Sequence, residues 1–209
     1  MTVSVILHDA AGASDAELAF IRESVSLLRE AVQAPGFGGS VRQAQYSSAS
    51  WRGRHGNVRQ LDGDGVWDRI VQGRESGHCG DHALNLSIEI ADLPDDKAGR
   101  GVIGATRIGT LPIYSARWFL NRCMIVDDPV NYAAHLMHQW MHVSGFVHRK
   151  DDAGKDAPSV VSRLVRRTLE PAHGERIDAQ LTALVTLSIE VCECCDADAD
   201  DTGERVEAA

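Results

Sequence analysis

The fold of this chain is decided by residues 138–148, which read His138-Gln139-Trp140-Met141-His142-Val143-Ser144-Gly145-Phe146-Val147-His148. His138 and His142 are four residues apart, so on a helix their imidazoles project from one face, about one turn from each other. Gly145 can adopt a left-handed conformation and end that helix, which turns the chain so that His148 comes back toward the first two. The stretch therefore predicts a helix that ends at a glycine, with three histidines gathered at one point.

Three neutral imidazole nitrogens at one point are typical ligands of zinc. They fill three of the four positions of a tetrahedral site, and a catalytic zinc keeps its fourth position for water or substrate. The alternative is three unrelated histidines, one buried and two solvated, and a lone His-x-x-x-His pair would not exclude it. The full spacing with a glycine at the turn is much rarer, because several independent positions must agree. We therefore predict one Zn²⁺ per chain, bound by His138, His142 and His148.

The pattern resembles the metzincin zinc peptidases, whose consensus is His-Glu-x-x-His-x-x-Gly-x-x-His. A weaker resemblance, from about residue 41 to residue 148, is to small bacterial zincin-like proteins. The resemblance implies an α/β (α+β zincin-like) fold and a zinc metalloendopeptidase acting on a peptide or protein substrate. In that fold a strand at the rim of the cleft pairs with an extended substrate. The matching segment here is residues 102–108, with Val102, Gly104 and Thr106 as substrate-binding positions.

Position 139 departs from the family, because Gln139 stands where the family has Glu. In the resembling enzymes that Glu takes a proton from the zinc-bound water and returns it to the leaving amine. Gln keeps the shape and the hydrogen bonding but has no basic carboxylate, so we expect this sequence to be inactive or nearly so. Two explanations remain open: an engineered Glu-to-Gln substitution in an active peptidase, or a natural pseudoenzyme that is a zinc-stabilised peptide- or protein-binding module. We favour the first because every ligand position is intact.

A second departure concerns the floor of the site. No methionine follows Met141, so the methionine-bearing turn of metzincins cannot be present. The small zincin-like proteins have a Val-Pro-Tyr-like stretch where this chain has residues 156–161, and Ser159 stands in the Tyr position. If that Tyr stabilises an oxyanion in the relatives, Ser159 is a catalytic candidate that is too short for the role.

The remaining elements are predicted from periodicity and from turn residues. Ser14 and Glu17 form a capping-box pattern ahead of a helix that ends before Pro35, and Asp128 with Pro129 starts the histidine helix. Further strands are expected at residues 3–7, 41–46, 84–90, 101–110 and 115–121, and further helices at residues 66–71, 160–169 and 177–191. This order predicts a mixed, twisted sheet of about four or five strands, backed by helix 14–34 and with the histidine helix beneath it.

Length, charge and cysteine usage bound the class of protein. The 209 residues fit a single zincin-like domain over residues 1–195 followed by an acidic tail, residues 196–209, that carries six acids against Arg205. A net charge of −9 argues against a nucleic-acid partner. We find no signal peptide and no apolar run long enough for a membrane span, so we expect a cytoplasmic protein with free thiols, although delivery elsewhere as an effector stays open.

Other groups could hold a metal, but a simpler interpretation is favoured for each. Residues 78–82 (His78-Cys79-Gly80-Asp81-His82) read more simply as a solvated loop that enters a strand. His135 is expected to be a neighbour of the zinc ligands rather than a ligand. The run Cys192-Glu193-Cys194-Cys195 reads as a frayed helix end.

Overall fold

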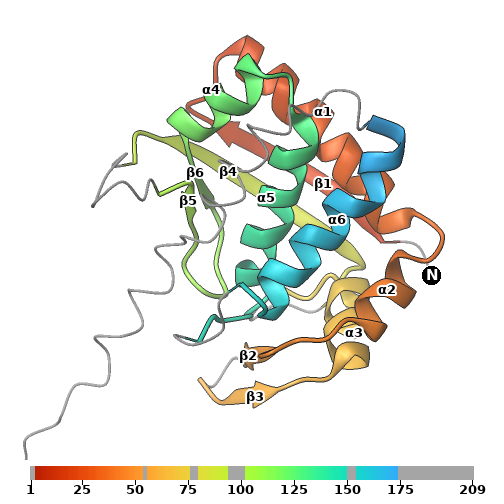
Figure 1. The fold of residues 1–209 in the computed structure, drawn as a ribbon. Helices are drawn as coiled ribbons and strands as arrows, with labels where there is room; N and C mark the ends of the chain where they lie inside the picture. Colours follow the sequence, from red (N-terminus) through yellow and green to blue (C-terminus); the bar gives the residue numbers. More distant parts are fainter. Residues whose placement is uncertain (1–2, 54–55, 76–79, 94–101, 150–153, 174–209) are drawn as a thin grey trace, which may run out of the picture.

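A mixed four-stranded sheet forms the framework of the fold. The computed structural model describes residues 3–53, 56–75, 80–93, 102–149 and 154–173. Across the sheet the strands follow the order β1 (Ser4–Ala11), β4 (Ala83–Ala91), β6 (Ile113–Ala116) and β5 (Gly104–Ala105). The first three are parallel, whereas β5 runs antiparallel to β6 and forms an edge of the sheet (Figure 1). The expected mixed α/β class is confirmed.

One face of this sheet is covered by helices. On β4 the side chains of Leu84, Leu86 and Ile88 are buried, whereas Asn85 is half-buried and Glu89 is exposed. This alternation follows from the strand repeat of two residues, which sends neighbouring side chains to opposite faces. The apolar side chains of β4 belong to the main core, so the opposite face of the sheet carries polar groups.

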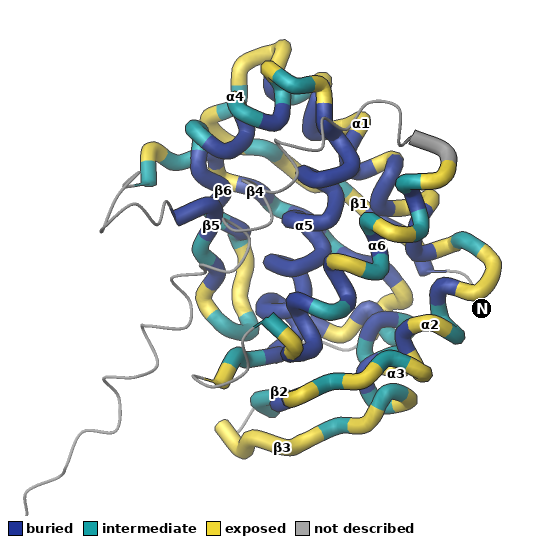
Figure 2. The backbone as a smooth tube through the Cα atoms, viewed as in Figure 1, coloured by how far each residue is buried: buried dark blue, intermediate teal, exposed yellow. Residues whose placement is uncertain are grey.

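Six helices and a two-stranded ribbon complete the described fold. They are α1 (Asp15–Gln33), α2 (Phe37–Gln43), α3 (Gly63–Gln72), α4 (Arg117–Ile125), α5 (Pro129–Val143) and α6 (Ala157–His173), with β2 (Ser50–Arg52) and β3 (Val58–Gln60) in the ribbon. Helix α5 packs against α1, α4, α6 and the sheet, and all of its residues are buried (Figure 2). Among the described residues, no helix has both the length and the apolar character that a membrane crossing demands.

The predicted elements are confirmed where caps and periodicity agree. The strands expected at residues 3–7 and 84–90 form β1 and β4, and the helices expected at residues 14–34, 66–71 and 160–169 form α1, α3 and α6. Helix α5 begins as predicted, because the Asp128 side chain accepts from the N–H of Asn131 and Pro129 takes the first helical position. The helix expected at residues 177–191 and the tail at residues 196–209 lie outside the described residues.

Two predicted strands are wrong. Residues 41–46 do not form a strand, because residues up to Gln43 belong to α2, where Phe37 and Val41 are buried four residues apart on one helix face. The strand predicted at residues 115–121 ends at Ala116, after which α4 begins and buries Phe119 and Cys123 at the same spacing. The strand predicted at residues 101–110 is reduced to the two residues of β5.

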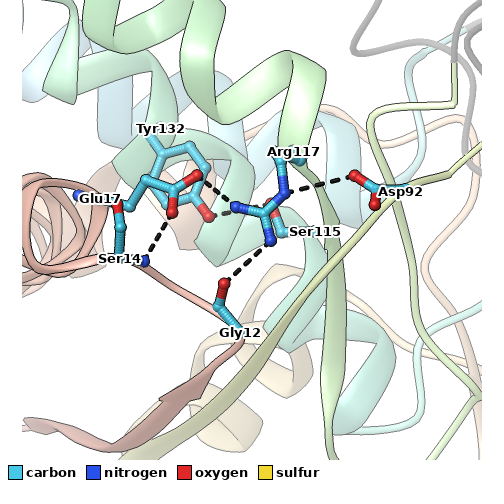
Figure 3. Close-up of polar contacts among 7 residues, drawn as sticks. All are labelled: Gly12, Ser14, Glu17, Asp92, Ser115, Arg117 and Tyr132. Carbon is cyan, nitrogen blue, oxygen red and sulfur yellow. Dashed lines mark hydrogen bonds and ion pairs between the residues drawn. The ribbon is translucent and has the colours of Figure 1, made fainter.

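A partly buried ion pair fixes the start of α1 against the start of α4 (Figure 3). Glu17 completes the predicted capping box with Ser14, and its carboxylate accepts from Arg117 Nη1 at 2.7 Å. Arg117 also donates to the Gly12 carbonyl at 2.9 Å and pairs with Asp92 at 3.3 Å. Burial alone would raise the pKa of Glu17, but the hydrogen bonds of Ser14 and the guanidinium of Arg117 hold that pKa below its usual value.

Candidate metal centre

Three histidines converge at the C-terminal part of α5. His138 and His142 lie one turn apart on that helix, and His148 follows the turn that ends it. The Nε2 atom of His138 lies 3.3 Å from the Nε2 atoms of both His142 and His148, and the three nitrogens lie within 4.8 Å of one another. The three side chains are therefore close enough to bind one metal ion.

Hydrogen bonds behind two of the three rings, those of His142 and His148, fix which of their nitrogens faces the centre of the cluster. His142 Nδ1 lies 2.8 Å from the Phe146 carbonyl, and His148 Nδ1 lies 2.8 Å from a carboxylate oxygen of Asp156. A carbonyl and a carboxylate only accept, so both Nδ1 atoms carry a proton, and in the neutral ring each Nε2 atom keeps a lone pair. Two lone pairs then point at the same place as His138 Nε2, an arrangement that a cation stabilises. The donor set of this chain therefore fits a metal.

Burial keeps the rings of His138 and His142 neutral. It lowers the pKa of His142 to about 3, with a further contribution from the charge that His148 would carry. Burial likewise holds the pKa of His138 well below its usual value, and the neighbouring His142 and His148 add to the effect. Neutral imidazole is the form that binds a metal, so His138 and His142 are in the binding form at neutral pH.

The turn after α5 returns His148 to the cluster, and β2 holds that turn in place. Gly145 has a φ of 104°, and a Cβ added there would lie 2.7 Å from the Arg52 carbonyl oxygen, so only glycine fits. The indole of Trp51 donates to the Ser144 carbonyl at 2.7 Å, and the N–H of Arg52 donates to Gly145 at 2.8 Å. The predicted role of Gly145 as the helix end is confirmed.

Asp156 joins the third histidine to α6. One of its oxygens accepts from His148 Nδ1, and the other accepts from the N–H of Ser159 at 2.9 Å, which caps the first turn of the helix. Burial alone would raise the pKa of Asp156, but the bond to His148 and the N–H of Ser159 lower it. Sequence reasoning missed this partner of His148, although an Asp two residues before Pro158 is a readable start signal for a helix.

Gln139 connects α5 to the edge of the sheet. It is fully buried, and its Oε1 accepts from the hydroxyl of Thr106 at 2.7 Å. A Cβ on Gly104 would lie 2.6 Å from His135 Cε1 and 3.1 Å from Gln139 Nε2, so β5 can pack this closely against α5 only because residue 104 is a glycine. His135 is itself 3.3 Å from the hydroxyl of Ser115 through its Nε2.

Tyr132 joins the first half of α5 to β6 of the sheet by a hydrogen bond. Its hydroxyl donates to Ser115 Oγ at 2.9 Å, and Figure 3 shows this bond from α5 to the end of β6. Burial lowers the pKa of His135, which stands beside this pair, to about 3. A row of polar contacts therefore runs from Tyr132 through Ser115 to His135, one turn before the ligand His138.

The predicted substrate-binding positions do not share one environment. Gly104 and Thr106 lie against Gln139, whereas the carbonyl of Val102 accepts from the indole of Trp118 at 3.0 Å. Ser159, the catalytic candidate, lies in the first turn of α6 beside Asp156. Two of the three rim positions are thus adjacent to the helix that carries the histidines.

Residues 78–82, considered above as a second metal site, lie partly outside the described residues. Cys192, Cys194 and Cys195 lie wholly outside them. Among residues 80–82, His82 contacts the Val71 carbonyl through Nδ1 at 2.8 Å, and the Asp81 carboxylate accepts from the N–H of Ala83. Within the part of the chain that the structure describes, the three-histidine cluster is the one group of three or more residues arranged to hold a metal.

No protein family, curated protein or solved structure matches this chain. Its function must therefore follow from the geometry and chemistry of the site.

Proposed function

We propose that this chain is a zinc-binding protein of the metalloendopeptidase type in which Gln139 stands at the position of the general base. The observation that carries the proposal is the convergence of three imidazole nitrogens at one point, with Gln139 on the same helix between His138 and His142. The hydrogen bonds of His142 and His148 add to the spacing, because they orient two ring nitrogens toward a shared centre.

Zinc is the metal that this donor set favours. Imidazole suits zinc and the later transition metals, whereas magnesium and calcium prefer oxygen ligands, and all three converging atoms are nitrogens. Three protein ligands leave a tetrahedral ion one further position. Zinc bound there would supply Lewis acidity toward a carbonyl group and toward water.

Gln139 determines whether such a site can turn over a substrate. Neither the oxygen nor the nitrogen of its amide is basic at neutral pH, so the side chain cannot take up a proton as a carboxylate does. The shape of the side chain and its bond to Thr106 are kept. We infer that the chain as written binds zinc and hydrolyses peptides at a rate close to background, and that a carboxylate at position 139 would raise that rate.

A second candidate function is a zinc-stabilised module that binds extended peptides without cleaving them. It is favoured by the hydrogen bond between Gln139 and Thr106, because this bond makes the side chain at position 139 a brace between α5 and the segment after β5. Strand β5 lies at the edge of its sheet, where an extended chain can add by main-chain hydrogen bonds.

The test compares the chain with its Gln139→Glu variant on one diverse peptide pool. Both proteins are loaded with equal zinc, and products are identified by mass spectrometry. Loss of a positioned general base costs about 10²- to 10⁴-fold in rate, so we expect the variant to gain at least about a hundredfold. His142→Ala in the Gln139→Glu background, or a chelator, should remove the gain.

The outcome separates the two candidates. A Gln139→Glu protein that is folded and fully zinc-loaded but cleaves nothing in the pool would exclude the peptidase and leave the binding module. Cleavage that survives His142→Ala would show that the activity does not depend on this site.

A further inference from the structure

A cavity of about 610 Å³ opens on the polar face of the sheet, at the start of β4. Its polar wall is made by His8 of β1, Asn85 of β4 and the carboxylates of Glu75 and Asp81. None of the three clustered histidines lines it. Val143 is the one residue of α5 in the described lining, and Gly109, whose N–H donates to the His142 carbonyl, also lines the cavity. Its volume is typical of a pocket for a small ligand or a side chain.

Two carboxylates share one amide in this cavity. Asn85 Nδ2 donates to Glu75 Oε1 at 3.2 Å and to Asp81 Oδ2 at 3.0 Å, which uses both of its hydrogens. The same Glu75 oxygen accepts from the Asn85 backbone at 3.1 Å and from the Trp140 indole at 3.2 Å. Glu75 itself is only 6% exposed. Two negative groups are thus brought together without a cationic side chain in the described lining.

The donor groups of the remaining polar side chains in the wall are already bonded to acceptors within the chain. Because both Asn85 hydrogens go to carboxylates, its Oδ1 must be the acceptor for His8 Nε2 at 2.8 Å, and His8 therefore keeps a lone pair on Nδ1 when neutral. The hydroxyl of Thr110 donates to the Arg107 carbonyl at 3.0 Å. Every side-chain group that these residues still offer is an acceptor. A ligand that matches this wall must be rich in donors and positively charged.

We propose that this cavity binds a guanidinium group, as carried by an arginine side chain. A guanidinium has five N–H donors in a planar fork and can pair with two carboxylates at once, which a compact ammonium does less well. The apolar side chains of Leu111 and Val143, which also line the cavity, suit the aliphatic stem. The proposal does not depend on the metal centre, because no ligand of that centre contacts the cavity.

The probe is N-acetyl-arginine amide, and N-acetyl-citrulline amide is its neutral counterpart of the same shape. Binding to the full chain is measured by calorimetry, with and without added zinc. The indole N–H of Trp140 reports the location by NMR, since it donates to Glu75 and should shift when that carboxylate gains a further partner. We expect the arginine probe to bind about ten- to a hundredfold more tightly than the citrulline probe, as charged hydrogen bonds require.

Glu75→Gln and Asp81→Asn should each weaken arginine binding at least about tenfold and reduce the preference over citrulline. Asp81 is exposed, so its variant remains informative if the buried Glu75→Gln protein fails to fold. Glu89→Gln is the matched control, because it removes the same charge from an exposed position on β4 outside the cavity, and it should bind as the parent does. Equal affinity for the two probes, or unchanged binding by folded Glu75→Gln and Asp81→Asn proteins, would overturn the proposal. Loss of arginine binding only when zinc is removed would also do so.

Discussion

Replacement of Asp156 by alanine should weaken zinc binding and destabilise the chain by two separable routes. The structure gives its two oxygens separate tasks, one on His148 Nδ1 and one on the N–H of Ser159. Loss of the hydrogen-bond partner behind a ligand histidine typically costs about 10- to 100-fold in metal affinity. Loss of a helix cap costs about 1 kcal/mol of folding free energy. Asp156→Ala should therefore show both effects, the first by chelator competition and the second by chemical unfolding without metal.

Asp62→Ala provides the matched control. The Asp62 side chain caps α3 by accepting from the N–H of Gly65 at 2.8 Å, and neither residue belongs to the histidine cluster. Its loss should also cost about 1 kcal/mol of stability, but zinc affinity should not change. If Asp156→Ala binds zinc as tightly as the parent while Asp62→Ala shows the expected loss of stability, the orientation of His148 by Asp156 is refuted.

Two further predictions concern the interior around the metal helix. Burial lowers the pKa of His135 and of His142 to about 3, so between about pH 6.5 and 3 the unfolded chain binds protons that the folded chain does not. The unfolding free energy of the metal-free protein should fall as pH drops below 6.5, by up to about 1.4 kcal/mol per pH unit per histidine. The range from pH 6.5 to 5 lies above the usual pKa of carboxylates, so an unfolding free energy that stays constant over it would contradict the lowered pKa of the two histidines. Gly104→Ala should cost about 1–3 kcal/mol, since its Cβ would lie 2.6 Å from His135, whereas Gly39→Ala in α2, with open space around its Cβ, should be neutral or stabilising. Equal stability of the two alanine variants in urea unfolding would show that β5 does not need this close approach to α5.

The sequence predicts the parts of this structure that depend on local signals. The capping box of Ser14 and Glu17, the start of α5 at Asp128 and its end at Gly145 all follow from residues a few positions apart. The approach of His138 and His142 follows from the helix repeat alone. The return of His148 could be expected from the glycine, because no other residue takes that turn without strain.

The two wrong strands fail for a local reason as well. Residues 115–121 contain three consecutive large apolar side chains, Trp118, Phe119 and Leu120, and such a short run fits a strand or a helix equally well. Cys123 favours the helix, because it lies one turn beyond Phe119 and is buried against the same core. In residues 41–46, Val41 likewise pairs with Phe37 at helical spacing before the expected strand begins.

The partners of the site depend on tertiary structure and could not be predicted from spacing. Trp51 precedes the turn that it holds by 93 positions, and Thr106 precedes Gln139 by 33. Nothing local in the sequence links such residues, because the contacts form only when the β2 ribbon and β5 pack on α5. Asp156 lies near His148 in sequence, yet its role needs the start of α6 to be placed at Ala157.

The most direct test of the three-histidine centre is the zinc content of the purified chain, measured by elemental analysis beside His148→Ala and His8→Ala. The parent and His8→Ala, whose histidine lies on β1 outside the cluster, should each hold about one zinc per chain, because three histidines complete one site. His148→Ala should be folded and close to empty. Near-full zinc in folded His148→Ala, or a folded parent that takes up no zinc at neutral pH, would contradict the assignment of His138, His142 and His148 as a single metal centre.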